Sequence, residues 1–231
     1  MPKVGESESS IADTCALSAN RRIIVIADGA SRSFQPRAWA ESLVRGIVHA
    51  GGLLGPKVIK RAADAGDLER DLPLTWNQEE LRDRGSFATV LVASACVRHG
   101  RRVVRVSSIG DCAICTVKGP GHLGRVEAPW PPVSSLTGDT PPSAASSIAP
   151  YITGDGIQRT DLWLSRDDSL LLLTDAMARW VTGRVMRDEH TLGDLLPFVS
   201  GDSTFANWAE PLRQSGALAN DDLMVVWARW R

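Results

Sequence analysis

The run between Ser86 and Lys118 constrains the fold more than any other part of this chain. Its three apolar segments, at 86–97, 102–108 and 113–118, follow one another through very short turns. Neighbouring parallel strands need a crossover of a dozen or more residues, and these connections have no room for one. The three segments are therefore predicted to be antiparallel strands, joined as hairpins or as a meander.

Helical patterns occur on both sides of this run. Trp39, Leu43 and Ile47 recur at helical spacing after the Asp28-Gly29 turn. Further helices are predicted within 57–84, interrupted by Pro73, and within 175–217, and further strands at 22–27, 169–174 and 223–230. This order does not fit a doubly wound parallel sheet. It predicts an α+β fold, in which two antiparallel sheets pack together with helices outside, in one domain of residues 1–231.

The charge balance and hydropathy exclude several functional classes. The 231 residues include 26 basic and 27 acidic side chains, which gives no basic field for nonspecific nucleic-acid binding. No apolar run approaches the roughly 20 residues of a membrane-spanning helix. The first six residues lack the apolar region of a secretory signal. We therefore expect a soluble, cytoplasmic, monomeric protein without nucleic-acid or membrane partners.

Two of the four cysteines, Cys112 and Cys115, have the spacing of a redox or zinc motif. They fall in or beside a predicted strand, where residues three apart point to opposite faces of the sheet. No second cysteine pair or nearby histidine completes a zinc site. We predict that both thiols are small buried core groups.

Residues 128–150 are rich in Pro, Ser, Thr and Gly and predict a long irregular loop. Loops of this length are commonly functional or mobile. The four histidines, at 49, 99, 122 and 190, show no metal-ligand spacing, and we assign them structural or surface roles.

Aspartates stand at the ends of several apolar strand segments. Asp28, Asp111 and Asp175 each follow such a segment, and Asp221-Asp222 precedes the last one. A single carboxylate there is usually a turn former or a helix cap. If these strand ends share one edge, however, the carboxylates converge and need a counter-charge. A hard divalent cation with oxygen ligands supplies it, which favours magnesium or manganese over zinc.

The order of short motifs resembles the PP2C-type, metal-dependent serine/threonine protein phosphatases over nearly the whole chain, in a bacterial version. Each motif is weak alone, but six occur in the family's order. They are Ile11-Ala12-Asp13-Thr14, Val25-Ile26-Ala27-Asp28-Gly29-Ala30, Gly85-Ser86-Phe87-Ala88-Thr89, Ile109-Gly110-Asp111-Cys112, Leu172-Leu173-Thr174-Asp175-Ala176 and Asp221-Asp222-Leu223-Met224-Val225-Val226. The resemblance implies the family's αββα sandwich, which agrees with the two-sheet prediction above.

The resemblance also implies a metal site with two Mg²⁺ or Mn²⁺ ions and a third, weaker ion. Asp28 would bridge the two ions, with the Gly29 carbonyl as a further ligand. Asp175 and Asp221 would complete one shell, Asp13 would act near the other ion, and Asp111 would hold the third. The implied reaction is hydrolysis of a phosphate monoester by metal-activated water, without a covalent intermediate.

The chain departs from the family pattern at three points. Ala12 replaces an acidic residue, Ala176 replaces a glycine, and no arginine precedes Asp13 to hold the substrate phosphate. Lys3, Arg32 or Arg37 could supply that cation, and Arg32 is our first choice because guanidinium suits paired phosphate oxygens. Asp222, where the family often has asparagine, is predicted to be a turn or supporting residue.

Three functional hypotheses follow. The first is an active phosphatase that acts on phosphoserine or phosphothreonine of a signalling partner protein, opposed by a Ser/Thr kinase. The second is a catalytically degenerate domain that keeps the fold as a binding or regulatory module, which Ala12, Ala176 and the missing upstream arginine favour. The third is a metal-dependent hydrolase of a different substrate.

Overall fold

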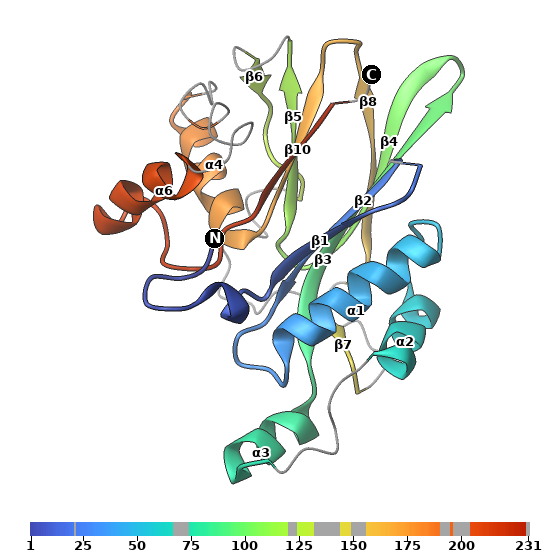
Figure 1. The fold of residues 1–231 in the computed structure, drawn as a ribbon. Coiled ribbons are helices and arrows are strands. Elements are labelled where there is room, and N and C mark those ends of the chain that lie inside the picture. The colour runs from blue at the N-terminus through green and yellow to red at the C-terminus, as the bar shows by residue number, and fades with distance from the viewer. Residues whose placement is uncertain are drawn as a thin grey trace.

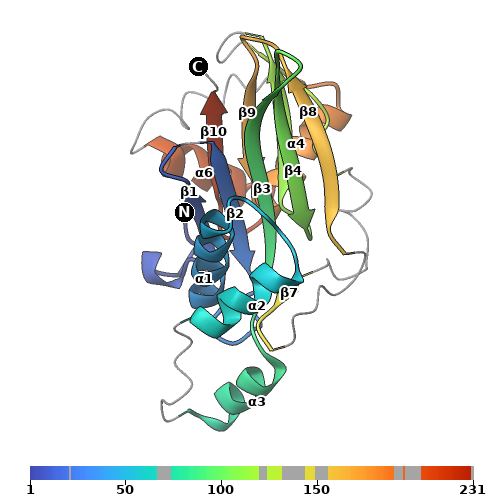
Figure 2. The same ribbon diagram turned by 90° about the vertical axis from the view of Figure 1, so that its right-hand side faces the viewer.

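Two antiparallel β-sheets face each other in the middle of the molecule, with helices outside both (Figures 1 and 2). The computed structural model describes residues 1–20, 22–66, 74–119, 124–131, 144–148, 156–189, 195 and 204–229. The arrangement confirms the predicted α+β fold. The placement of all 231 residues in one domain stays a prediction.

The first sheet has the strand order β1-β2-β3-β4-β8, and the short strand β7 also pairs with β3. Its strands are β1 (Asp13–Leu17), β2 (Ile23–Gly29), β3 (Phe87–Arg98), β4 (Arg101–Ile109), β7 (Ala145–Ser146) and β8 (Gln158–Leu164). All its pairings are antiparallel, and the β3–β4 hairpin turns at the residues between Arg98 and Arg101.

The second sheet has the order β10-β9-β5-β6 and is also antiparallel. Its strands are β5 (Ala113–Lys118), β6 (Arg125–Val126), β9 (Ser169–Leu173) and β10 (Val225–Arg229). Every side chain of β9 is buried because this strand is covered on both faces and paired along both edges. Because both faces of β9 are covered, its sequence is continuously apolar and does not alternate.

Helices α1 (Pro36–His49) and α2 (Pro56–Ala65) cover the outer face of the first sheet. Proline stands in the first turn of each, where its missing N–H costs nothing. Helix α3 (Trp76–Arg84) lies away from the sheets and buries none of its residues. Helices α4 (Asp175–Met186) and α6 (Thr204–Gln214) cover the second sheet, and the helix η1 (Glu8–Ser10) precedes β1.

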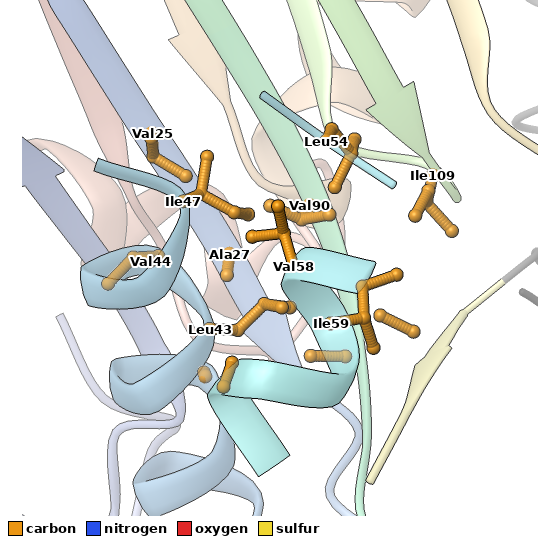
Figure 3. Packing of buried hydrophobic residues seen from close by; sticks show 14 of the residues in the cluster. Val25, Ala27, Leu43, Val44, Ile47, Leu54, Val58, Ile59, Val90 and Ile109 are labelled. Carbon is orange, nitrogen blue, oxygen red and sulfur yellow. The ribbon is translucent and has the colours of Figure 1, made fainter. Parts of the chain in front are cut away.

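Three apolar clusters fill the layers. Leu43 and Ile47 of α1 and Val58 and Ile59 of α2 point toward Val25, Ala27 and Val90 of the first sheet (Figure 3). The second cluster joins the two sheets, and the third joins the second sheet to α4 and α6. Each cluster removes large apolar side chains from water, which is the main favourable term in folding.

Most of the predicted elements are present, with boundaries shifted by one or two residues. Strands β1 and β8 were not predicted, because β1 is only five residues long and β8 begins with four polar residues, so neither contains a long apolar run. Cys112 and Cys115 are fully buried in different clusters, as predicted. Much of the predicted 128–150 loop, together with Pro73, His122 and His190, lies outside the described residues. Among the described helices, none combines the length and hydropathy of a membrane span.

Candidate functional site

The register of the β1–β2 pair places two predicted carboxylates directly opposite each other. Asp13, the first residue of β1, pairs with Asp28 near the end of β2. Asp13 is 7% exposed, and Gly29 beside Asp28 is buried. A Cβ atom on Gly29 would lie 2.5 Å from the Pro36 carbonyl oxygen, so only glycine lets α1 begin this close to the strand. The strand end that carries Asp28 is thus fixed by the helix layer.

Thr174 joins this pair to the second sheet. Its hydroxyl Oγ1 donates a 2.7 Å hydrogen bond to Asp13 Oδ2 and accepts a 3.1 Å bond from the Met224 backbone N–H. Because Thr174 directly precedes Asp175, the end of β9 brings a third carboxylate to the same edge. The other oxygen of Asp13, Oδ1, is buried and has no hydrogen-bond partner within the part of the chain that the structure describes.

Arg179 holds two further carboxylates. Its Nη2 atom lies 2.9 Å from Asp175 Oδ2 and 3.8 Å from Asp111 Oδ2. Asp175 and Arg179 are four residues apart on α4, so their side chains share one face of the helix. Asp111 follows β4 and is 7% exposed. The predicted convergence therefore includes Asp111.

The loop before β10 brings the last pair of acids. Asp221 is 42% exposed in its side chain and forms a 3.0 Å ion pair with Lys3, which also donates to Ser31 Oγ at 2.8 Å. Asp222 is 6% exposed, accepts the Ala12 backbone N–H at 2.8 Å, and leaves its Oδ1 buried without a partner. Asp222 thus has the supporting position predicted for it, although it lies deeper than Asp221.

The buried Arg213 fixes this loop to the start of the chain. Its guanidinium donates to the Pro2 carbonyl at 2.8 Å and to the Asp221 carbonyl. Met1 and Leu223 exchange backbone hydrogen bonds in both directions. The segment that carries Lys3 and the segment that carries Asp221 are therefore both bound to the guanidinium of Arg213.

The carboxylates brought together here (the acidic site) are Asp13, Asp28, Asp111, Asp175 and Asp221. The ionised form is disfavoured in four of them, because their pKa values are raised. Burial first, and then the neighbouring carboxylates, raise the pKa of Asp28 to about 9. Burial also raises the pKa of Asp13 to about 7, although the Thr174 hydrogen bond opposes this, and the pKa of Asp175 to about 6. The pKa of Asp111 is raised by burial, against a lowering effect of Arg179. Such shifts at a group of neighbouring acids are typical of functional sites.

The ligand atoms that the site offers are oxygens, which suit a hard divalent cation. It offers carboxylate oxygens at one sheet edge, one of them buried and unpaired on Asp13, and such oxygens are the ligands that Mg²⁺ and Mn²⁺ prefer. Within the described residues, however, no group of three or more His, Cys, Asp or Glu side chains is arranged to hold an ion. The contacts from Thr174, Arg179 and Lys3 engage part of the carboxylate oxygens instead.

The predicted phosphate-binding residues are distributed differently. Arg32 is exposed and has no ion-pair or hydrogen-bond partner among the described residues. Arg37 pairs with Glu41 and with the carbonyls of Glu8 and Ser9. Of the three cations considered, Lys3 is the one in contact with a site carboxylate.

Sequence reasoning did not identify Arg179, and it named Thr174 only as a member of a motif, without a role. The i,i+4 spacing from Asp175 was a usable signal for Arg179. No comparable signal marks Thr174, because its partner Asp13 is 161 residues away.

No family model and no curated protein sequence matches the chain. Solved structures do match over its length. The photosystem II phosphatase PBCP matches with a TM-score of 0.59 and 14% identity, over 100% of this chain and 96% of that one. PppA, a regulatory component of the T6SS in Pseudomonas aeruginosa, gives 0.55 and 16%, over 99% and 95%. The Mycobacterium tuberculosis serine/threonine phosphatase PstP/Ppp gives 0.57 and 14%, over 100% and 96%.

These comparisons confirm the resemblance to PP2C-type bacterial serine/threonine phosphatases at the level of the fold. Fold alone does not assign chemistry, because one fold hosts many functions.

Proposed function

We propose that this chain is a bacterial, cytoplasmic phosphatase that hydrolyses phosphoserine or phosphothreonine on a partner protein, with Mg²⁺ or Mn²⁺ as cofactor. The single observation that carries the proposal is the pair formed by the buried Asp13 and the partly buried Asp28. These carboxylates face each other with raised pKa values and without an ion-pair partner among the described residues. Carboxylates kept in this state destabilise the folded protein, and a bound cation would remove that cost.

Asp13, Asp28, Asp175, Asp221 and the Gly29 carbonyl are proposed to hold the cations. When bound, the cations would lower the pKa of a water molecule and offset charge on the phosphoryl group. Thr174 donates to one oxygen of Asp13, which orients the carboxyl group and leaves its other oxygen available. Asp222 accepts from the Ala12 N–H and so fixes the start of β1, where Asp13 follows.

Lys3 is proposed to orient the substrate. Its ammonium group lies beside Asp221, and its side chain is 20% exposed, so it can donate to a phosphoryl oxygen that enters the site. Arg32 stays a second prediction for this role. A Ser/Thr kinase is the expected opposing enzyme, since the substrate has to be phosphorylated.

The test is hydrolysis of a small aryl phosphate and of a phosphoserine peptide, with manganese added or chelated. We expect turnover that requires manganese and is lost in Asp28→Asn. The matched control is Asp167→Asn, because Asp167 is an exposed carboxylate in the turn before β9. Absence of manganese-dependent turnover in the folded wild-type protein would contradict the proposal.

A regulatory or binding module is the second candidate, and one observation favours it. Arg179 contacts Asp111 and Asp175 and Lys3 pairs with Asp221, so part of the negative charge of these three carboxylates is offset without a divalent cation. This candidate predicts a folded protein with no turnover on either substrate. A hydrolase of a different substrate would bind manganese but release no phosphate from the peptide.

A further inference from the structure

The acidic site has two halves that differ in their counter-charge. In the inner half, Asp13 and Asp28 have no ion-pair partner among the described residues. In the outer half, Asp111 and Asp175 share one guanidinium nitrogen of Arg179. Both outer carboxyl groups are well buried, with side chains 9% and 13% exposed.

The position of Arg179 is determined by the helix on which it stands. Asp175 begins α4 and Arg179 follows one turn later, so the guanidinium returns to the end of β9. Its side chain is 52% exposed, which means that it enters the outer half from solvent. Opposite charges at such separations attract strongly where the carboxylates are removed from water.

An arginine in this place acts against a divalent cation. It occupies one oxygen of Asp175, contacts Asp111 and adds a positive charge that repels a second cation at the same carboxylates.

We propose that Arg179 is the built-in counter-cation of Asp111 and of the Oδ2 atom of Asp175, and that it excludes an additional divalent cation from between these two carboxylates. This inference rests on the cation binding in the proposed function, but it does not need hydrolysis. It changes the expected role of Asp111, which binds Arg179 in place of a third metal ion. The number of bound cations is then set by one residue of α4.

The test counts bound Mn²⁺ on the full chain by equilibrium dialysis and by the loss of the free-ion EPR signal, with no phosphate compound present. We expect Arg179→Met to bind one more Mn²⁺ than the wild type. The affinity of Asp111 and Asp175 for this extra ion should be about tenfold or more higher in the variant than in the wild type. Arg179→Lys should behave like the wild type, because it keeps the charge. Arg187→Met, which removes a charge at the end of the same helix, is the matched control.

The double variant Arg179→Met/Asp111→Asn assigns the extra ion. If the inference holds, the additional Mn²⁺ disappears in this protein. Identical binding curves for the wild type and Arg179→Met would overturn the inference, as would an extra ion that persists in the double variant. If Arg179→Met does not fold, Arg179→Gln replaces it, because its amide keeps the polarity without the charge. Loss of hydrolysis alone would count against the proposed function and leave the binding curves as an independent result.

Discussion

The two ends of strand β9 carry buried aspartates in opposite electrostatic states. Before the strand, Asp168 is 6% exposed and accepts hydrogen bonds from Ser165 N at 2.8 Å, Lys118 Nζ at 2.9 Å and Gly119 N at 3.4 Å. Burial alone would raise the pKa of Asp168, but these three donors lower it. After the strand, burial and neighbouring acids raise the pKa of Asp175, and those of Asp13 and Asp28 beside it.

The comparison separates a structural carboxylate from candidate functional ones. Burial acts in the same direction at both ends, so it does not distinguish them. The difference is the supply of donors, which is complete at Asp168 and incomplete at Asp13 and Asp28. The same chain supplies three donors to Asp168 but too few to Asp13 and Asp28, which lowers the stability of the folded protein. Such a loss of stability is typical of a site that binds a ligand.

The largest expected effect is on activity at the acidic end. Asp28→Asn should lower manganese-dependent hydrolysis on the order of a thousandfold, since it removes the charge that would hold the cations. Asp168→Asn should leave hydrolysis within about twofold, because it lies at the opposite end of β9. Steady-state rates with an aryl phosphate measure both. Equal losses in the two variants would remove the functional distinction between the two ends.

The next effect is on stability at the structural end. Asp168→Ala should lower the free energy of unfolding by about 2–3 kcal/mol, because it removes a charge-assisted hydrogen bond and two backbone ones. Urea unfolding followed by tryptophan fluorescence measures it. The exposed neighbour Asp167→Ala should change the free energy by less than about 0.5 kcal/mol. An unchanged midpoint for Asp168→Ala would show that its three donors contribute nothing.

The third effect is a pH dependence with opposite signs at the two ends. Asp28 and Asp13 stay protonated in the folded state up to about pH 9 and 7, whereas the unfolded chain releases these protons near pH 4. Without divalent cations, the free energy of unfolding should therefore fall as pH rises from about 4 to 8. Asp168 behaves in reverse: its contribution is present above its unfolded pKa and is lost as pH falls through its lower folded value.

Chemical denaturation at pH 5 and pH 8, with and without manganese, measures this dependence. Manganese should reduce the loss of stability at pH 8, since it favours the ionised carboxylates. Asp28→Asn should reduce the same loss in the cation-free protein. A free energy of unfolding that rises between the two pH values without manganese would contradict the raised pKa values.

The smallest effect concerns the link between the sheets. Thr174→Val keeps the shape of the side chain but removes the donor to Asp13 and the acceptor for Met224. It should lower the free energy of unfolding by about 1–2 kcal/mol. It should also weaken Mn²⁺ binding, because Asp13 loses the donor that favours its charged form. Thr182→Val, on α4 and also buried, is the control, since Thr182 Oγ1 has no hydrogen-bond partner.

The sequence predicted those parts of the fold whose signal is local. Strands β3, β5 and β9 are apolar on both faces and were recognisable without knowledge of their neighbours. The alternation in β8 and the shortness of β1 gave weaker patterns. Both strands depend on a partner to fix their register.

The site divides in the same way. The strand-end pattern in the sequence marked Asp28, Asp111, Asp175 and Asp221, whereas Asp13 was named through the family resemblance. Asp28 interacts electrostatically with the other four carboxylates, so all five lie near one another. Contacts that depend on packing were not visible, because Lys3 reaches Asp221 and Thr174 reaches Asp13 only after both sheets have formed. Whether the five carboxylates ligate a metal stays a prediction.

The contact between Gly29 and the Pro36 carbonyl has a consequence for engineering. Because no Cβ fits between them, any substitution there moves the amino end of α1 or the tip of β2. Randomising residue 29 would consequently select glycine in a screen for folded protein and in a screen for turnover alike. Grafting a different helix onto this sheet would have to preserve the same backbone-to-backbone approach before the placement of Asp28 could be kept.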